Sequence, residues 1–208
     1  MKRILVVGAL AVLAVTSSGA FASSSDGGYF TSVDVGVARY HVGRIGIDGY
    51  VQDEKNPVAA VRFGYYWQGA FNLGVETGYV NLGKLDSHYV GDYSYHSGLR
   101  ASGWMIGLNG TYRFDSPWYV SARGGMLRSM LDRNYSYQNL PYGPLSSGFG
   151  SASGTGTGWY AGMGGGYDFT EKFSVGLQYD NYHVKARLGG DSLSGSISAF
   201  TIQAEYRY

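Results

Sequence analysis

Three features of the chain predict an all-β fold, an eight-stranded antiparallel up-and-down transmembrane β-barrel. Apolar and polar residues alternate in eight segments, as side chains on the two faces of a strand do. The connections between these segments are alternately long and short, which is typical of barrels with short turns at one end and longer loops at the other. Beyond an export signal, no run is apolar enough for a membrane-spanning helix, so the chain could cross a membrane only as a barrel.

The first 22 residues have the layout of a secretory signal peptide. Met1-Lys2-Arg3 is basic, residues 4–15 are apolar, and Ala20-Phe21-Ala22 is a small-residue cleavage site. The apolar run is shorter than the roughly 20 residues that a membrane-spanning helix needs. We therefore expect a signal peptide over residues 1–22 and one barrel domain over residues 23–208. No cysteine follows the site, so no lipid anchor is expected.

Composition excludes several classes of partner. Removal of Lys2 and Arg3 leaves 14 basic and 15 acidic residues, a balance that argues against a nucleic-acid partner. The four histidines are scattered and there is no cysteine, so no metal-binding spacing exists. The glycines of residues 162–166 lie inside a strand pattern and open no helix, unlike a phosphate-binding loop. We expect no cofactor and no metal.

The first four strands are expected at residues 29–40, 58–67, 71–83 and 103–114. Their apolar parity should face lipid, and the intervening polar, charged or glycine residues should face inward. The lipid-facing residues include Val33, Val35 and Val37 in the first strand, Val61, Phe63 and Tyr65 in the second, Leu73, Val75 and Tyr79 in the third, and Trp104, Ile106 and Leu108 in the fourth. Residues 68–70 form a tight turn, whereas the polar segments 41–57 and 84–101 are expected to be long loops.

The last four strands are expected at residues 118–128, 158–169, 173–185 and 197–208. The lipid-facing residues include Trp118, Val120 and Met126 in the fifth strand, Trp159, Ala161 and Met163 in the sixth, Phe173, Val175 and Leu177 in the seventh, and Phe200, Ile202 and Tyr206 in the eighth. Residues 115–117 and 170–172 should be short turns. The Gly- and Ser-rich segment 129–157 is expected to be a mobile loop, and 186–196 a shorter one.

Aromatic residues mark both ends of the predicted barrel. Those at the short-turn end include Tyr65, Trp67, Tyr112, Phe114, Trp118, Tyr167, Phe169, Tyr206 and Tyr208, and those toward the long loops are Tyr79, Trp104, Trp159, Tyr179 and Phe200. Two aromatic girdles at membrane interfaces are typical of outer-membrane barrels, and an even strand count puts both termini on the periplasmic side. The alternative is a soluble eight-stranded barrel, which would hold its apolar residues inside and its charges outside.

Charged residues on the inward parity predict a closed lumen. They are Asp34, Arg62, Glu76, Arg113, Arg123, Asp168, Asp180, Glu205 and Arg207. The interior of an eight-stranded barrel is just wide enough for side chains to fill it, and charges there are costly unless they pair. We expect a charge network in which Arg62 pairs with Glu76 on the adjacent strand, and in which Glu205 and Arg207 join Arg113 and Arg123. The alternative is that some of these residues line small water pockets without contacting one another.

Three motifs carry a resemblance to a known family. Gly74-Val-Glu-Thr-Gly-Tyr79, Gly158-Trp-Tyr-Ala-Gly-Met-Gly-Gly-Gly-Tyr-Asp-Phe-Thr170 and Gln203-Ala-Glu-Tyr-Arg-Tyr208 resemble the eight-stranded outer-membrane barrels related to the OmpA transmembrane domain and to OmpX/Ail. The resemblance covers the mature chain and implies an outer-membrane location without the periplasmic domain of OmpA.

The resemblance also implies a role for the terminal strand as the signal read by the assembly machinery. The residues concerned are Phe200, Ile202, Tyr206 and Tyr208. The family most often ends in Phe, and this chain ends in Tyr, which is also aromatic.

The resemblance and the loops favour a structural or surface-interaction role, such as adhesion or resistance, through long extracellular loops. The expected partners are outer-membrane lipids and lipopolysaccharide, the assembly machinery, and a host or surface ligand. Arg39, Lys84 and Arg128 near the outer strand ends could meet lipopolysaccharide phosphates, or extend to the interface as basic residues commonly do. One alternative is a narrow pore for ions or small solutes. Another is a lipid-A-modifying enzyme, but the His-x-Ser pattern of the known deacylase is absent after His183, and no enzymatic activity is expected.

Overall fold

The computed structural model describes residues 27–41, 50–52, 55–90, 93–139, 147–188 and 191–208. The predicted signal peptide lies outside the described residues. The described strands are β1 Gly27–His41, β2 Tyr50–Gln52, β3 Lys55–Trp67, β4 Asn72–Val90, β5 Tyr93–Arg113, β6 Trp118–Asn139, β7 Ser147–Asp168, β8 Phe173–Leu188 and β9 Asp191–Arg207.

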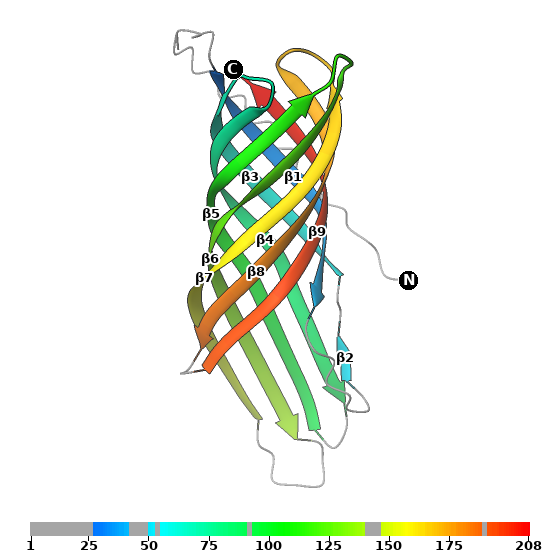
Figure 1. Ribbon diagram of the computed structural model, residues 1–208. Helices are drawn as coiled ribbons and strands as arrows, with labels where there is room; N and C mark the ends of the chain where they lie inside the picture. Colours follow the sequence, from blue (N-terminus) through cyan, green and yellow to red (C-terminus); the bar gives the residue numbers. More distant parts are fainter. Residues whose placement is uncertain (1–26, 42–49, 53–54, 91–92, 140–146, 189–190) are drawn as a thin grey trace, which may run out of the picture.

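Eight of these strands form a closed antiparallel barrel. The order is β4-β3-β1-β9-β8-β7-β6-β5, and a β4–β5 pairing closes the sheet on itself. The first and last barrel strands lie side by side, with Asp34 opposite Gln203. Figure 1 shows the tilted strands, with the C-terminus and the short turns at the top, the predicted periplasmic end, and the longer connections at the outer end below. The predicted eight-stranded up-and-down barrel is confirmed.

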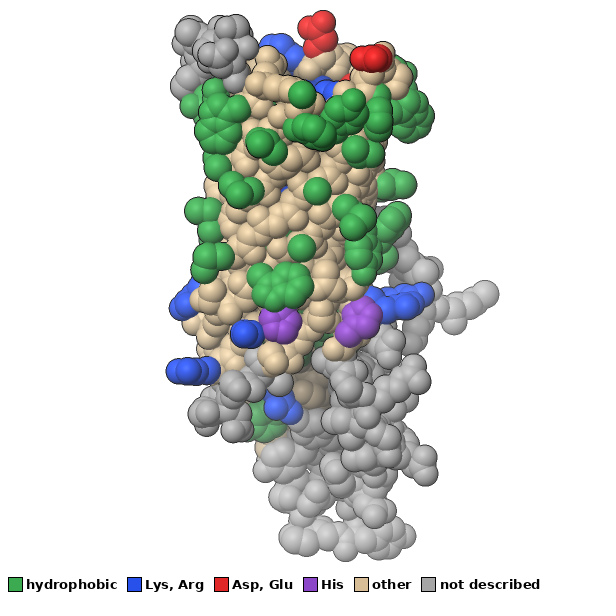
Figure 2. Space-filling model, viewed as in Figure 1, with side chains coloured by type: hydrophobic (Ala, Val, Ile, Leu, Met, Phe, Trp, Pro, Cys, Tyr) green, Lys and Arg blue, Asp and Glu red, His purple; other side chains and the backbone are tan. Residues whose placement is uncertain are grey.

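The predicted parity is also correct in the barrel wall. Ile106 and Met163 on the outer surface are 64% and 67% exposed, whereas Asp34 and Arg62 on the inward parity are each 1% exposed. Figure 2 shows apolar side chains in a band across the visible face of the barrel, with basic and histidine side chains at its outer edge. A soluble barrel would have the reverse arrangement, so the soluble alternative is wrong.

The prediction of long loops is wrong over most of these segments, because the strands continue into them. Segment 84–101 is a hairpin in which Lys84 pairs with Arg100 and Val90 with Ser94. Segment 129–157 is largely paired from Ser129–Gly156 outward, and segment 41–57 contributes the short strand β2, which pairs with the outer part of β4. Outside a membrane both faces of a sheet can contact water, so pairing there does not require apolar alternation.

One irregularity in β4 changes which residues face inward. The register between β4 and β5 shifts between Asn81 and Lys84. Gly83 has a φ of +84°, in the left-handed region that glycine adopts without strain, as in a β-bulge. Leu82 is therefore buried before the bulge and Leu85 after it, while Lys84 is exposed. Without the extra residue, Lys84 would take an inward position.

The aromatic girdles lie where the sequence predicts them. At the periplasmic end, the rings of Trp118 and Tyr167 are 5.3 Å apart in edge-to-face geometry. At the outer end, the rings of Tyr79 and Trp104 are 5.2 Å apart in the same kind of contact. Such aromatic belts lie at the headgroup level of a bilayer, so they delimit the membrane-spanning part of the barrel.

Candidate functional site

Arg62 is the centre of a buried charge cluster, which we call the middle cluster. Its guanidinium donates to Asp34 and, at 2.9 Å, to the hydroxyl of Tyr182. Its Nη2 lies 3.6 Å from Asp180 Oδ2, and its Nε lies 3.7 Å from Glu76 Oε1. The structure thus brings Arg62 near the predicted partner, Glu76, but its shorter contacts are to Asp34 and Tyr182.

Glycines opposite Arg62 and Glu76 give these long side chains room inside the barrel. Arg62 pairs with Gly78 and Glu76 with Gly64 across β3 and β4. A Cβ atom on Gly78 would lie 3.0 Å from Arg62 Cγ, which is tighter than normal packing. The inward glycines noted in the sequence therefore have a packing reason, because a larger residue would displace the arginine.

Arg123 completes the middle cluster from the opposite wall. Its Nε and Nη2 donate to the two oxygens of Asp180 at 2.8 and 2.6 Å, a bidentate pair. Gly162 lies between them in the sheet, and any Cβ there would collide with the Asp180 carboxylate. Arg123 Nη2 also lies 3.6 Å from Asp34 Oδ1. Two arginines thus share Asp34 and Asp180, which locks β1, β3, β6 and β8 to one another across the lumen.

Glu76 is held mainly by neutral donors. Tyr160 donates its hydroxyl to Glu76 Oε1 at 2.7 Å, and Asn109 Nδ2 donates to Oε2 at 3.2 Å. The middle cluster holds three carboxylates and two guanidinium groups, so these donors supply stabilisation that ion pairing alone does not.

A second group, the periplasmic cluster, lies toward the short turns. Arg113 Nε donates to Asp168 Oδ2 at 3.0 Å and lies 3.6 Å through Nη2 from Glu205 Oε1. Arg207 contacts the same two carboxylates, at 3.0 Å to Asp168 and 3.5 Å to Glu205. The guanidinium of Arg207 also donates through Nε to the carbonyl oxygen of Glu171 at 3.0 Å. This cluster contains two acids and two bases and is partly exposed.

The expectation of a single network over Arg113 and Arg123 is wrong. Among the ion pairs of the described residues, none joins Arg123 to the periplasmic cluster. Arg113 lies opposite Tyr119, whereas Arg123 lies opposite Asn109. The two arginines are therefore four residues apart along the strand direction, or about 13 Å, beyond the reach of a shared carboxylate.

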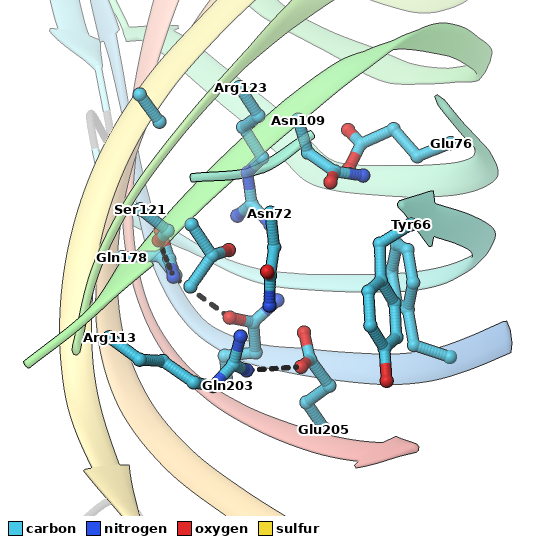
Figure 3. Close-up of a pocket in the computed structure, with 13 residues that line it drawn as sticks. Tyr66, Asn72, Glu76, Asn109, Arg113, Ser121, Arg123, Gln178, Gln203 and Glu205 are labelled. Carbon is cyan, nitrogen blue, oxygen red and sulfur yellow. Dashed lines mark hydrogen bonds and ion pairs between the residues drawn. The ribbon is translucent and has the colours of Figure 1, made fainter. Parts of the chain in front are cut away.

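A small polar cavity of about 30 Å³ separates the two clusters. Figure 3 shows Arg113 and Glu205 on one side of it and Glu76, Asn109 and Arg123 on the other. Gln178 lines it and donates through Nε2 to Ser121 at 3.0 Å and to Gln203 at 2.8 Å. The cavity has room for about one or two water molecules. Ion pairs and a water-sized pocket therefore coexist in this lumen, although they were alternatives at the level of the sequence.

The outer half of the lumen is filled by apolar side chains, which the sequence analysis missed. We name this the apolar layer; it consists of Ala38, Tyr40, Val58, Ala60, Val80, Leu82, Leu85, Ala101, Met105, Leu127, Leu131, Tyr160, Tyr182, Val184, Ala186, Ile197 and Ala199. All are at most 6% exposed. The signal was available, because Leu127 and Leu131 continue the inward parity of Arg123, but Leu131 lay in a segment interpreted as a loop.

The remaining predicted residues lie on the outer surface. Phe200, Ile202, Tyr206 and Tyr208 are 45–54% exposed on the lipid face of the terminal strand. The backbone N–H of Tyr208 donates to the carbonyl of Tyr29 at 3.0 Å, so the last residue is still held against β1. Their role in assembly stays a prediction.

The described residues show neither a metal-binding group of side chains nor a membrane-spanning helix. They contain no group of three or more His, Asp or Glu side chains placed to hold a metal ion. No helix in the described part of the chain is long and apolar enough to span a membrane. His183, the histidine considered for catalysis, stacks on Trp159 with ring centroids 5.6 Å apart.

Comparison with solved structures gives outer-membrane barrels at low sequence identity. OprG from Pseudomonas aeruginosa is 12% identical with a TM-score of 0.53, covering 88% of this chain and 97% of OprG. Ail from Yersinia pestis is 13% identical with a TM-score of 0.46, covering 87% and 99% of the two chains. Neisserial surface protein A is 10% identical with a TM-score of 0.43, covering 86% and 97%. The likeness to OprG shows a common fold.

Comparison with curated proteins gives no match. The outer membrane protein beta-barrel domain, in contrast, matches residues 8–208, which is nearly the whole chain. Together with the closed eight-stranded barrel and its apolar outer surface, this match shows that the chain belongs to the outer membrane protein β-barrel domain family and lies in the outer membrane.

Proposed function

We propose that this protein is a sealed barrel that acts at the cell surface, as a structural and interaction protein and not as a channel or an enzyme. The observation that carries the proposal is the double closure of the lumen. The middle cluster spans the barrel from wall to wall, with Arg62 and Asp180 each 1% exposed. The apolar layer fills the lumen beyond it, with Leu82 and Leu127 each 0% exposed.

The pore alternative has only the polar cavity in its favour. The cavity lies between the two charge clusters, and its volume of about 30 Å³ is far smaller than the water-filled passage of a porin. An ion leaving it toward the outside would meet the Arg62 ion pairs and then the apolar layer.

The strands that extend beyond the outer girdle support a surface role. β4, β5, β6 and β7 form a protruding sheet, which we define as residues 84–90, 93–100, 132–139 and 147–155, with β2 against its β4 edge. The opposite edge, on β7, pairs with β6 and has no second strand partner among the described residues. This edge segment carries no charged residue, and Phe149 on it is 93% exposed. Open strand edges can accept an extended segment of another protein.

Planar-bilayer conductance of the refolded mature chain, residues 23–208, tests the closed lumen. We expect no steady conductance, because neither half of the lumen offers a continuous aqueous path. Reproducible channel openings with purified protein would contradict the proposal and favour the pore alternative.

A shortened hairpin tests the surface role. Replacing residues 135–150 by Asn-Gly would close the hairpin at the paired residues Asn134 and Ser151 with a favoured turn. Bacteria that express this variant should lose the protein's contribution to attachment on matrix-coated surfaces or to survival in serum. The matched control replaces residues 87–97 by Asn-Gly, between the paired Asp86 and Gly98. Equal activity of the first variant and the unchanged protein would contradict a role for the β7 edge.

A further inference from the structure

The β7 edge of the protruding sheet lacks the features that usually keep strand edges from pairing. Natural edges are protected by charged side chains, by proline or by a covering segment. Residues 147–155 contain no charged residue and no proline, and among the described residues β7 pairs here with β6 alone. Figure 1 shows β6 and β7 extending past the outer ends of β8 and β9, so this edge lies beyond the wall that the eight strands share.

The edge is long enough to form a ladder with another strand. Residues 147–155 form a longer stretch than the mean strand of about 5–6 residues. Its exposed side chains include Ser151 and Ser153, which are too short to obstruct an approaching backbone. Every copy of the chain carries the same edge, and a contact about a two-fold axis needs only one kind of surface. A second copy can therefore supply the partner strand.

The direction of β7 decides how two copies can pair. β7 runs from the outer end of the barrel toward the periplasm in every copy. Two copies in one membrane are related by an axis along the membrane normal, so a strand tilt of about 40° would make their β7 edges cross at about 80°, which is unsuitable for a ladder. A two-fold axis perpendicular to the sheet reverses both the strand and the membrane. Antiparallel pairing of two β7 edges therefore requires two membranes that face each other.

The edge lies far enough from the membrane for two such copies to meet. Its midpoint, Ser151, lies eight residues before Trp159 of the outer girdle along β7. With about 3.3 Å per residue and a tilt of about 40°, Ser151 is roughly 20 Å outside the girdle, and two paired copies would hold their girdles about 40 Å apart. Headgroups extend only about 5 to 7 Å beyond the hydrocarbon core, so both membranes fit.

We propose that the β7 edge binds the β7 edge of a second copy of this chain in an opposing membrane, and that the protein thereby joins two cells. In the register centred on Ser151, Phe149 of one copy lies opposite Ser153 of the other. Main-chain hydrogen bonds supply the affinity of such a pair, and many copies in each membrane multiply it. The inference rests on the proposed surface role and names its partner.

The test mixes two populations of phosphatidylcholine vesicles that carry different dyes and the mature protein, residues 23–208. Clusters that contain both dyes are counted by two-colour fluorescence at about 0.15 M salt. We expect mixed clusters when both populations carry the protein and none when one population is empty. Absence of mixed clusters in the first case would overturn the proposal. Equal clustering with empty vesicles would also overturn it, because the protein would then bind lipid and not a second copy.

Charge variants test whether edge meets edge. In S151K/S153K, lysines of the two copies lie opposite each other whether the ladder is centred on Ser151 or on Ala152, and like charges at such positions repel. Mixed clusters should fall about tenfold, because a small loss at each pair is multiplied over many pairs. S151E/S153E should show the same loss. Vesicles with the lysine variant mixed with vesicles with the glutamate variant should cluster again, because opposite charges then face each other.

Two results with these variants would overturn the proposal. One is clustering by S151K/S153K within twofold of the unchanged protein. The other is no recovery of clusters when the lysine and glutamate variants are mixed, because recovery is the result that only direct contact between the two edges predicts.

N134K/S136K is the matched control, because it adds the same charge on β6, one strand away from the edge. Asn134 pairs with Ser151 and Ser136 with Phe149, so the new charges lie at nearly the same height. Three strand spacings separate them from their counterparts in the second copy, about 14 Å, which exceeds the screening length of about 8 Å. Clustering should stay within twofold of the unchanged protein. A loss as large as that of S151K/S153K would show that repulsion between the membranes controls clustering, and would contradict the proposal.

The shortened hairpin distinguishes failure of this inference from failure of the proposed surface role. Replacement of residues 135–150 by Asn-Gly removes part of the edge and its β6 partners, so mixed clusters should be lost together with attachment. Clusters that persist at the unchanged level in this variant would contradict the assignment to the edge. If the variant loses attachment but the unchanged protein forms no mixed clusters, the surface role stands, the edge binds a segment of another protein, and this inference is wrong.

Discussion

The two halves of the lumen are equally buried but are closed by different interactions. Arg62 in the middle cluster is 1% exposed and Leu127 in the apolar layer is 0% exposed. A buried charge depends on each of its partners, and the removal of one leaves the others uncompensated in a medium of low polarity. A buried leucine depends only on how well its volume is filled. The charged half of the lumen therefore depends on a few specific ion pairs, whereas the apolar half depends on the total volume of its side chains.

The largest effect is expected from Arg62→Ala in the charged half. This change leaves Glu76 without its guanidinium contact and leaves Arg123 as the one arginine for Asp34 and Asp180, so three buried carboxylates face a single guanidinium. Loss of one partner of a buried ion network costs about 3–5 kcal/mol. We expect the free energy of unfolding, measured by urea titration in phosphatidylcholine vesicles, to fall by about that amount.

The matched comparison for Arg62 is Arg62→Met, which keeps much of the side-chain volume and removes the charge together with the hydrogen-bond donors of the guanidinium. If the stabilisation comes from the charge of Arg62 and not from its volume, Arg62→Met should lose nearly as much free energy of unfolding as Arg62→Ala. A loss below about 1 kcal/mol in both variants would show that water already solvates the cluster, and the comparison of the two halves would fail.

An intermediate effect is expected from Leu127→Ala in the apolar half. The change opens a cavity in a layer where Leu127 packs with no exposure, and large-to-small changes of this kind cost about 2–5 kcal/mol. We expect about 3 kcal/mol in the same unfolding measurement. Leu127→Met should cost less than about 1.5 kcal/mol, because it conserves volume.

The neighbouring residue provides the control for Leu127. Met126 faces lipid and is 58% exposed, so Met126→Ala should change the free energy of unfolding by less than about 1 kcal/mol. Equal losses in the two alanine variants would indicate that the apolar layer is not packed more tightly than the lipid-facing surface.

The smallest effect is expected from Arg113→Ala in the periplasmic cluster. The Arg113 side chain is 26% exposed, and Arg207 remains to pair with Asp168 and Glu205. Its guanidinium also lies 5.6 Å from the ring centre of Tyr119. Partly exposed pairs contribute about 1 kcal/mol or less. A loss as large as that of Arg62→Ala would show that the two clusters act as one unit.

The parts of the barrel that cross the membrane could be predicted closely from the sequence. Val35 and Asp34, or Ile106 and Gly107, alternate because lipid and lumen impose opposite requirements on adjacent residues. The alternation of apolar and polar residues ends where the strands leave the lipid. The pairs Lys84–Arg100 and Ser129–Gly156 were interpreted as loops, because water on both faces of a sheet removes the alternation.

The sequence predicts which residues belong to the candidate site, but it does not predict which of them contact one another. Inward parity identifies Arg62, Glu76, Arg123 and Asp180 as lumen residues, because parity is a property of the strand alone. It does not give their partners, because those depend on the strand register and on which glycines leave space. Arg62 contacts Asp34 and Tyr182 more closely than the neighbour that sequence spacing favoured, and Arg113 belongs to a separate cluster.

The sequence by itself determined the compartment, the number of barrel strands and the face on which each membrane-spanning residue lies, because these follow from local alternation and from the length of each segment. The tertiary structure decided the rest. Closure of the sheet brought Arg123 within 2.6 Å of Asp180 across the intervening strand and placed an apolar layer on the outer side of the charges, and the bulge at Gly83 turned Lys84 outward. Contacts across a closed barrel depend on the register of every strand between two residues, and no single segment of sequence contains that information.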